Sequence, residues 1–231
     1  MFPFARILNY SNTVEIPLPL VYLPLSTDIV NHGDSTNPKY PNVNFTVQTA
    51  TLGTVSGRTG LVCNGSQRLY YDEVVMASTS WSAMQWVYTT STAAKAYINA
   101  SANVGFSYNT GGSPSLTRNF YCVNSGSTSN SYFGNYTMPV NTWVHVAYIY
   151  ERSTNTLKFY VNGELIKTQT VSPTFTGYGT GTATARSVGL GYYPGNATAT
   201  PLAGYISSHR LYDYALTDSM LKRIYDSENI I

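Results

Sequence analysis

The clearest structural signal in the chain is the run KFYVNGELIK at residues 158–167. Its central Asn-Gly pair lies between two apolar stretches, and such a pair favours a type I′ turn because both residues tolerate the positive φ angles that this turn requires. The run therefore predicts an antiparallel β-hairpin. A two-residue turn also sets the register, so we expect Tyr160 opposite Leu165 and Phe159 opposite Ile166.

Short runs of the same kind recur along the chain. They occupy residues 61–63, 69–71, 81–88, 119–123 and 143–150. Many short strands with almost no helical periodicity are typical of a β-sandwich or jelly roll, and sandwiches of 231 residues commonly form one domain. We therefore expect an all-β fold, a two-sheet antiparallel jelly-roll sandwich.

The C-terminal segment differs, because it carries the signals of a short helix. Thr217 is a good N-cap, Asp218 suits the positive helix start, and Leu216 with Leu221 fits a hydrophobic staple. The apolar stripe that follows consists of Leu221, Ile224 and Tyr225. This stripe predicts a short helix lying on the sandwich.

The first twenty residues do not follow the pattern of the rest, and they contain Pro3, Pro17 and Pro19. We expect residues 1–20 to form an arm that anchors the protein to something larger, and residues 21–231 to form the domain. A first edge strand is an equally good interpretation of the same segment.

Three segments together resemble the laminin G-like, or concanavalin A-like lectin/glucanase, jelly-roll family. They are SAMQWVY at residues 82–88, WVHVAY at 143–148 with LKFYVNG at 157–163, and residues 202–217 around Arg210-Leu211-Tyr212. The resemblance covers residues 20–227 and implies two stacked antiparallel sheets with ligands on the concave face or at one rim. We expect the layers to stack through the neighbourhood of Trp86, Trp143 and Phe159.

The composition narrows the classes of partner. Only 10% of the residues are charged, the net charge is +2, and 21 residues are tyrosine. The basic residues are scattered, whereas phosphate binding needs several cations on one face, so we expect no nucleic-acid partner. The apolar run at residues 18–25 is short and contains two prolines, so we expect no membrane insertion. The N-terminus lacks the pattern of a secretory leader, which favours synthesis in the cytoplasm.

The sequence offers no convincing catalytic pattern. Glycosidases of this fold need two carboxylates about 5–10 Å apart, and no strand carries acidic residues at suitable spacing. The adjacent pair Asp72-Glu73 would face opposite ways if extended. His32, His145 and His209 are not at the spacing of a zinc site. We therefore expect no enzymatic activity, no catalytic residue and no metal centre.

Calcium is the one cofactor for which the sequence offers candidate ligands. Asp28 and Asp34 could bind it together with backbone carbonyls. Many relatives carry acidic residues just before the closing arginine, whereas this chain has Ser207-Ser208-His209. This departure makes an inherited Ca²⁺ site doubtful, and no cofactor is expected.

Binding is the function that remains. Sugars are recognised by aromatic faces together with amide and carboxylate side chains, and three loop-like segments offer this mixture. The candidate ligand-binding residues are Asn130, Tyr132, Tyr136, Tyr178, Tyr192, Tyr193 and Asn196. Tyrosines at strand ends also commonly pack as core residues. The expected partner is a glycan or a cell-surface receptor.

We expect a non-catalytic virion surface protein, such as a phage or viral capsid or tail component, with a lectin-like domain for attachment to glycans or the host surface. One alternative is a purely structural decoration or minor capsid protein whose tyrosine-rich faces contact other virion proteins or further copies in a homo-oligomer. Another alternative is an extracellular location, as a secreted bacterial adhesin or carbohydrate-binding module.

Overall fold

The computed structural model describes most of the strands and the whole C-terminal helix. The described residues are 15–36, 45–47, 49–65, 69–71, 79–91, 96–100, 104–109, 119–124, 131–171, 188–192 and 201–229. All predictions for residues 1–14 lie outside this set, including most of the expected arm. Pro19 and Leu20 are buried, so the domain already begins at these residues.

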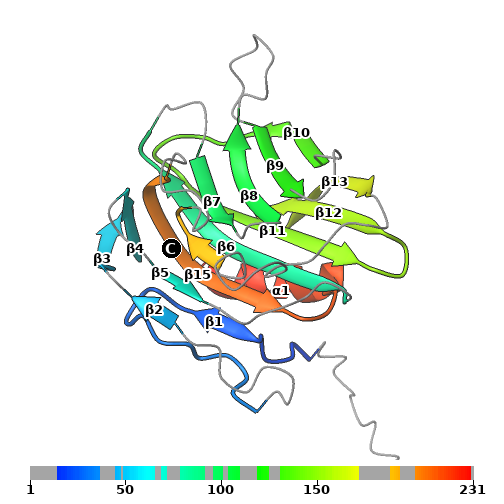
Figure 1. The fold of residues 1–231 in the computed structure, drawn as a ribbon, viewed down its shortest axis with the longest axis horizontal. Coiled ribbons are helices and arrows are strands. Elements are labelled where there is room, and N and C mark those ends of the chain that lie inside the picture. Colours follow the sequence, from blue (N-terminus) through cyan, green and yellow to red (C-terminus); the bar gives the residue numbers. More distant parts are fainter. Residues whose placement is uncertain are drawn as a thin grey trace, which may run out of the picture.

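Two antiparallel sheets form the body of the protein (Figure 1). The first sheet has the strand order β13 (Glu164–Thr170), β12 (Thr156–Val161), β11 (Trp143–Glu151), β6 (Trp81–Thr89), β15 (Ala203–Tyr212), β4 (Arg58–Asn64) and β3 (Leu52–Val55), with β1 (Val21–Leu23) also paired to β15. The second has the order β10 (Ser131–Thr137), β9 (Asn119–Asn124), β8 (Val104–Asn109), β7 (Ala96–Ala100), β14 (Val188–Leu190), β5 (Leu69–Tyr71) and β2 (Phe45–Val47). The predicted all-β jelly-roll sandwich is confirmed.

The predicted hairpin joins β12 to β13, and its turn is at Asn162-Gly163, with φ angles of 50° and 80°. Tyr160 pairs with Leu165, as expected. The second expected pair is wrong, because Phe159 lies opposite Lys167 and not Ile166. A register shift at this point places one extra residue in β13, and Ile166 turns to pack against the inter-sheet core.

The core between the sheets contains side chains from both layers. Phe159 and Tyr148 stack there with ring centroids 5.0 Å apart, together with Leu69 and Val188 of the second sheet. These side chains are almost completely buried. The expectation that Phe159 joins the two layers is therefore confirmed.

Trp86 and Trp143 lie elsewhere, on the outer face of the first sheet, where they form a cluster with Tyr88. The expectation that they join the two sheets is wrong. Successive residues of a strand face opposite ways, and Val87 is the neighbour that enters the inter-sheet core. Every residue of β6 is buried, so this outer face is covered as well.

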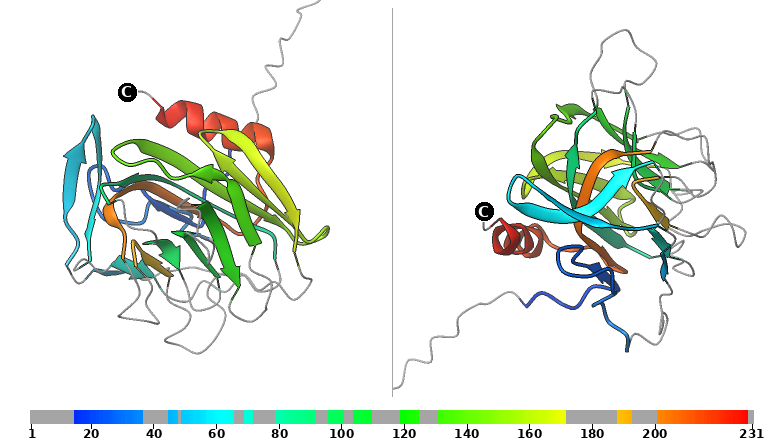
Figure 2. Two further views of the ribbon diagram at one scale, coloured as in Figure 1. Left: turned by 90° about the horizontal axis from the view of Figure 1, so that it is seen from above. Right: turned by 90° about the vertical axis from the view of Figure 1, so that its left-hand side faces the viewer.

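The cover on the outer face is the helix α1 (Asp218–Glu228), which Figure 2 shows lying outside the first sheet. Thr217 caps it by accepting a hydrogen bond from the Met220 N–H, 3.3 Å away. Leu221 and Ile224 are buried in a second cluster that also contains Leu216 and side chains from β6, β11, β12 and β15. The predicted helix and its cap are confirmed. Within the described part of the chain, no helix is long and apolar enough to span a membrane.

The far end of α1 is held by charged and aromatic groups. Glu228 pairs with the guanidinium of Arg210, and its Oε2 accepts a hydrogen bond from Trp86 Nε1 at 2.8 Å. Arg58, whose guanidinium lies 3.9 Å from the centre of the Trp86 ring, donates to the Glu228 carbonyl oxygen at 2.6 Å. Both ends of the helix are therefore fixed against the sheet.

Candidate ligand-binding pocket

The structure describes few of the binding residues that the sequence suggested. Asn130, Tyr178, Tyr193 and Asn196 lie outside the described residues, and only the backbone of Tyr132, in β10, is described.

Tyr136 and Tyr192 are the two candidate side chains that the structure describes. Tyr136 is half-buried and packs against the inter-sheet core, and burial raises the pKa of its hydroxyl. Tyr192 follows β14 and is only 8% exposed. Both side chains serve as packing residues, and a ligand site at the rim loops stays a prediction.

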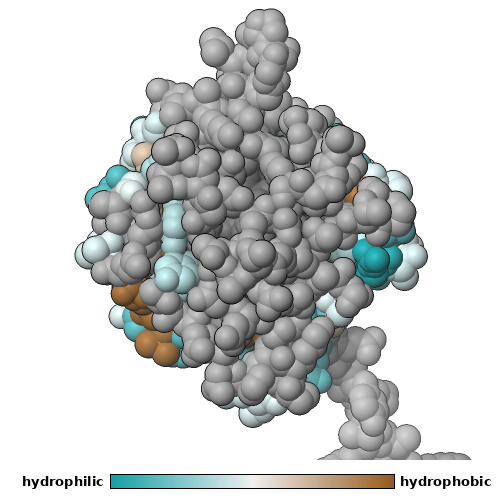
Figure 3. Space-filling view, viewed as in Figure 1, coloured by the Kyte–Doolittle hydropathy of each residue, from teal (hydrophilic) through white to brown (hydrophobic). Residues whose placement is uncertain are grey.

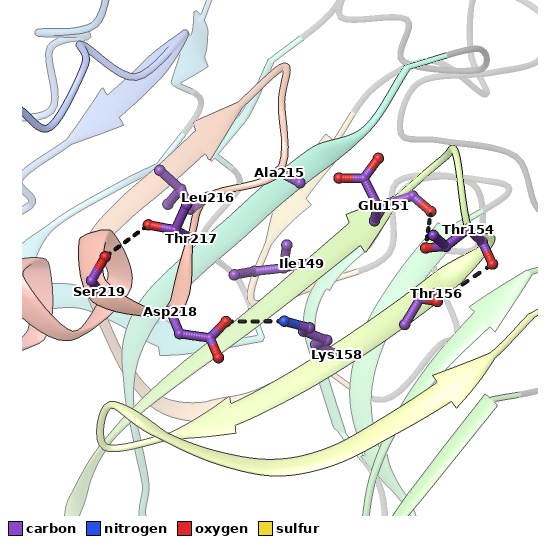
Figure 4. Close-up of a pocket in the computed structure, with 10 residues that line it drawn as sticks. All are labelled: Ile149, Glu151, Thr154, Thr156, Lys158, Ala215, Leu216, Thr217, Asp218 and Ser219. Carbon is purple, nitrogen blue, oxygen red and sulfur yellow. Dashed lines mark hydrogen bonds and ion pairs between the residues drawn. The ribbon is translucent and has the colours of Figure 1, made fainter.

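An open pocket of about 680 Å³ lies on the outer face of the first sheet, between β11, β12 and the start of α1 (Figure 4). Three apolar side chains line it, namely Ile149, Ala215 and Leu216. Four hydroxyl side chains surround them, namely Thr154, Thr156, Thr217 and Ser219. Glu151, Lys158 and Asp218 add charge. The pocket thus combines an apolar surface with closely spaced groups that can hydrogen-bond to a ligand.

Asp218 is positioned by the helix that it begins. Its Oδ1 accepts hydrogen bonds from the Tyr160 hydroxyl at 2.7 Å and from the Lys158 ammonium at 3.0 Å. The Tyr160 hydrogen bond, followed by the contact with Lys158, lowers the pKa of Asp218 below its usual value. The carboxylate is therefore ionised at neutral pH, and it is 60% exposed to the pocket and solvent.

Glu151 ends β11 at the other side of the pocket. Its Oε1 accepts hydrogen bonds from Ser80 Oγ at 2.9 Å and from Ser153 Oγ at 3.0 Å. The Ser80 hydrogen bond is the main reason that the pKa of Glu151 is lowered, and the charge of Lys158 acts in the same direction. Figure 4 shows Ile149 between Glu151 and Asp218.

No pattern in the sequence indicates that Glu151 and Asp218 share a pocket. Only the packing of α1 against β11 and β12 brings the two residues to one place. Asp218 could be recognised as a helix-start residue, whereas Glu151 has no local signal at all. The other acidic pair considered from the sequence, Asp72-Glu73, lies outside the described residues.

Two of the three histidines, His145 and His209, lie inside the protein. His145 and His209 are completely buried, and burial lowers the pKa of each to about 3. His209 Nδ1 lies 2.8 Å from Gln85 Oε1. His32 contacts Asp28 at 3.1 Å on the surface. These environments keep His145 and His209 neutral and away from solvent.

Asp28 and Asp34, the residues considered for Ca²⁺, each bind groups close by in the chain. Asp28 Oδ1 accepts a hydrogen bond from the Val30 N–H, and Asp34 Oδ1 accepts from the Thr36 N–H and hydroxyl. Among the described residues, no group of three histidine, cysteine or acidic side chains is arranged to hold a metal ion. The expectation that the protein has no cofactor, with Ca²⁺ binding doubtful, stays a prediction.

A family model described as the concanavalin A-like lectin/glucanases superfamily matches residues 64–222, which is more than half of the chain. The chain belongs to this superfamily. The concanavalin A-like fold expected from residues 82–88, 143–163 and 202–217 is therefore confirmed. A search of curated protein sequences found no match.

Solved structures with the same concanavalin A-like fold include domain 4 of AbnA, an extracellular arabinanase from Geobacillus stearothermophilus, in complex with arabinotriose. It is 19% identical, with a TM-score of 0.65 over 91% of this chain and 100% of that chain. The binding domain of botulinum neurotoxin serotype D is 12% identical, with a TM-score of 0.63 over 92% of this chain. The receptor-binding domain of the mosaic serotype C/D has a TM-score of 0.66 at 12% identity, again over 92% of this chain. The present chain spans 52% and 51% of those two neurotoxin chains.

Proposed function

We propose that this concanavalin A-like domain is a non-catalytic carbohydrate-binding protein, and that the pocket between β11, β12 and α1 is a saccharide site. The observation that carries the proposal is the arrangement of the pocket itself. Ile149, Ala215 and Leu216 offer apolar surface to the carbon-bound hydrogens of a sugar ring. The hydroxyl and carboxylate groups around them can satisfy the hydroxyls of the sugar.

The comparisons support a saccharide ligand in general terms. The arabinanase domain with the same fold was solved with arabinotriose bound, and the neurotoxin domains are described as receptor-binding. At identities of 12–19% the likeness concerns the fold, so the ligand of this chain has to be inferred from its own side chains.

The ionisation of the pocket favours binding over hydrolysis. A glycosidase needs one carboxyl group with a raised pKa, so that it is protonated and can donate its proton to the leaving oxygen. The pKa values of Glu151 and Asp218 are both lowered. Both groups are therefore ionised acceptors at neutral pH, which suits hydrogen bonding to a ligand better than proton donation.

For the biological setting, we propose a virion surface or, as the alternative, an extracellular protein. Low charge together with abundant tyrosine is the composition of a polar, adaptable interface. In this proposal residues 1–20 anchor the protein and the sandwich faces outward. A deletion of residues 1–14 keeps the buried Pro19 and Leu20 and tests the anchor, because loss of incorporation into particles is the expected result.

A structural role in contact with other virion proteins, or with further copies of the chain, is the second candidate. Several large apolar side chains are exposed, namely Leu18, Val30, Val47 and Leu165. Figure 3 shows apolar surface at the lower left, in the region of β2, which contains Val47. A contiguous apolar patch, such as the surface seen in the region of β2, suits a subunit contact. Replacement of Val47 and Val30 by serine would abolish such a contact and leave saccharide binding unchanged.

A glycan array read at millimolar sensitivity tests the carbohydrate proposal. We expect binding of at least one saccharide class, and loss of that binding in Ser219→Trp, which fills the pocket from an exposed position on α1. Ser227→Trp is the matched control, because it adds the same side chain to the same helix about 12 Å further along. No binding to any saccharide, or equal loss in both variants, would overturn the proposal.

A further inference from the structure

The charged groups of the pocket point to the class of saccharide that it accepts, an inference that rests on the proposed function. Two carboxylates and one ammonium group line the pocket, which gives it one net negative charge. The lowered pKa values of Glu151 and Asp218 keep this charge in place at neutral pH. The pocket therefore presents a negative potential to any ligand.

Lys158 is the one cation in the pocket, and it is already engaged. Its ammonium group donates to Asp218 Oδ1 at 3.0 Å, and the Lys158 side chain is 34% exposed. Its charge also acts on Glu151 from the opposite side. An anionic ligand would have to compete with Asp218 for this ammonium group and would meet Glu151 at the same time.

The free acceptor positions lead to the same conclusion. The hydrogen bonds that reach the two carboxylates from other residues of the described part of the chain use Glu151 Oε1 and Asp218 Oδ1. The second oxygen of each group, Glu151 Oε2 or Asp218 Oδ2, thus keeps its capacity to accept. A ligand that brings donors, either hydroxyls or a protonated amine, satisfies these oxygens, whereas a carboxylate or sulfate brings further acceptors.

We infer that the pocket selects saccharides bearing hydroxyl and ammonium groups over saccharides bearing a carboxylate or a sulfate. The apolar side chains Ile149, Ala215 and Leu216 contribute affinity for the ring of either class. Discrimination comes from Glu151 and Asp218, which attract an ammonium group, accept from neutral hydroxyls and repel an anion.

Calorimetric titrations with three matched oligosaccharides test this selectivity. The probes are compared at mildly acidic pH, where amino-sugar amines are protonated and uronic acids are ionised. They are a glucosamine trimer, which is then cationic, its N-acetylated counterpart, which is neutral, and a galacturonic acid trimer, which is anionic. We expect the cationic trimer to bind most tightly, the neutral trimer less tightly and the anionic trimer least tightly. Raising the salt concentration should weaken binding of the cationic trimer and leave binding of the neutral trimer almost unchanged, because salt screens only the interactions between charges.

Removal of each carboxylate charge gives the second arm. Glu151→Gln and Asp218→Asn keep an oxygen at each position. Each should lower the affinity for the cationic trimer about three- to fivefold, the effect of one partly screened charge. The same variants should raise the affinity for the anionic trimer. Glu164→Gln is the matched control, since Glu164 is an exposed residue of β13 outside the pocket lining, and it should change neither affinity.

The outcomes separate the two levels of the proposal. If the anionic trimer binds as tightly as the other two, or the charge-removing variants change nothing, the selectivity is wrong while saccharide binding stands. If no trimer binds and the glycan array is also empty, the proposed function itself fails and the selectivity falls with it.

Discussion

Glu228, the last residue of α1, forms a buried ion pair with Arg210 in β15. The side chains are 10% and 13% exposed, and Trp86 Nε1 donates to the same carboxylate. The pair fixes the C-terminal end of the helix on the outer face of the first sheet. Because the opposite end of the helix supplies Asp218 and Ser219 to the pocket, the position of α1 determines the shape of the candidate site.

Breaking this ion pair should destabilise the whole domain. Arg210→Met leaves the Glu228 carboxylate buried without its cation, and removal of one partner of a buried pair costs about 3–5 kcal/mol of unfolding free energy. The double variant Arg210→Met/Glu228→Leu removes both charges and should recover most of the loss. Urea unfolding measures the free energy of unfolding of both variants. A loss below about 1 kcal/mol in the single variant would contradict a buried, paired arrangement.

Acid should destabilise the protein in a pH range set by the buried histidines. In the folded state, the pKa values of His145 and His209 are lowered to about 3 from their ordinary value near 6.5. Between these two pH values, the unfolded chain therefore binds more protons than the folded protein does. Stability therefore falls as the pH falls. From pH 7.5 to 5, each histidine should account for about 2 kcal/mol.

His145→Phe provides the control for this pH dependence. Both ring nitrogens of His145 lack a hydrogen-bond partner within the described part of the chain, so an apolar ring loses no contact of that kind. The variant should lose about half as much stability as the parent between pH 7.5 and 5, because His209 is then the remaining one of the two buried histidines. An unchanged pH dependence in urea unfolding would show that His145 is not held neutral in the folded protein.

Gly163→Ala should weaken the contact between the hairpin and α1. Gly163 has a φ of +80°, and an added Cβ would lie 2.8 Å from Cδ1 of Tyr225 on the helix. We expect a loss of about 2 kcal/mol or more in thermal or urea unfolding, part from the backbone angle and part from the collision. Gly57 has the same φ in the turn between β3 and β4, so Gly57→Ala measures the loss of stability that the positive φ alone causes. Equal losses in the two variants would exclude the collision.

Local signals explain what could be predicted of this fold. The Asn-Gly turn fixed the β12–β13 hairpin and the pairing of Tyr160 with Leu165, and Thr217 with its apolar stripe fixed the helix. The predicted pairing is wrong at the next position, Phe159 with Ile166, because β13 contains a bulge there. The bulge lets Ile166 pack against the core, and the turn sequence does not determine it.

The misplaced tryptophans and the missed pocket have a common cause, the second buried face of the first sheet. A strand buried on both sides shows no alternation of apolar and polar residues, so the sequence of β6 does not reveal that Trp86 faces α1 and Val87 the inter-sheet core. The pocket was missed for the same reason. Glu151 and Asp218 line the same pocket only because the helix packs on this face.

Chemical-shift mapping with a bound saccharide tests the central claim most directly. The isotope-labelled protein would be titrated with the saccharide that binds most tightly, and the backbone amide signals followed by NMR. We predict that the largest shifts fall on Thr154, Thr156, Asp218 and Ser219 at the pocket and are absent in Ser219→Trp. Shifts confined to the segments around Tyr132, Tyr178 and Tyr193, or no shifts with any saccharide, would contradict a binding site between β11, β12 and α1.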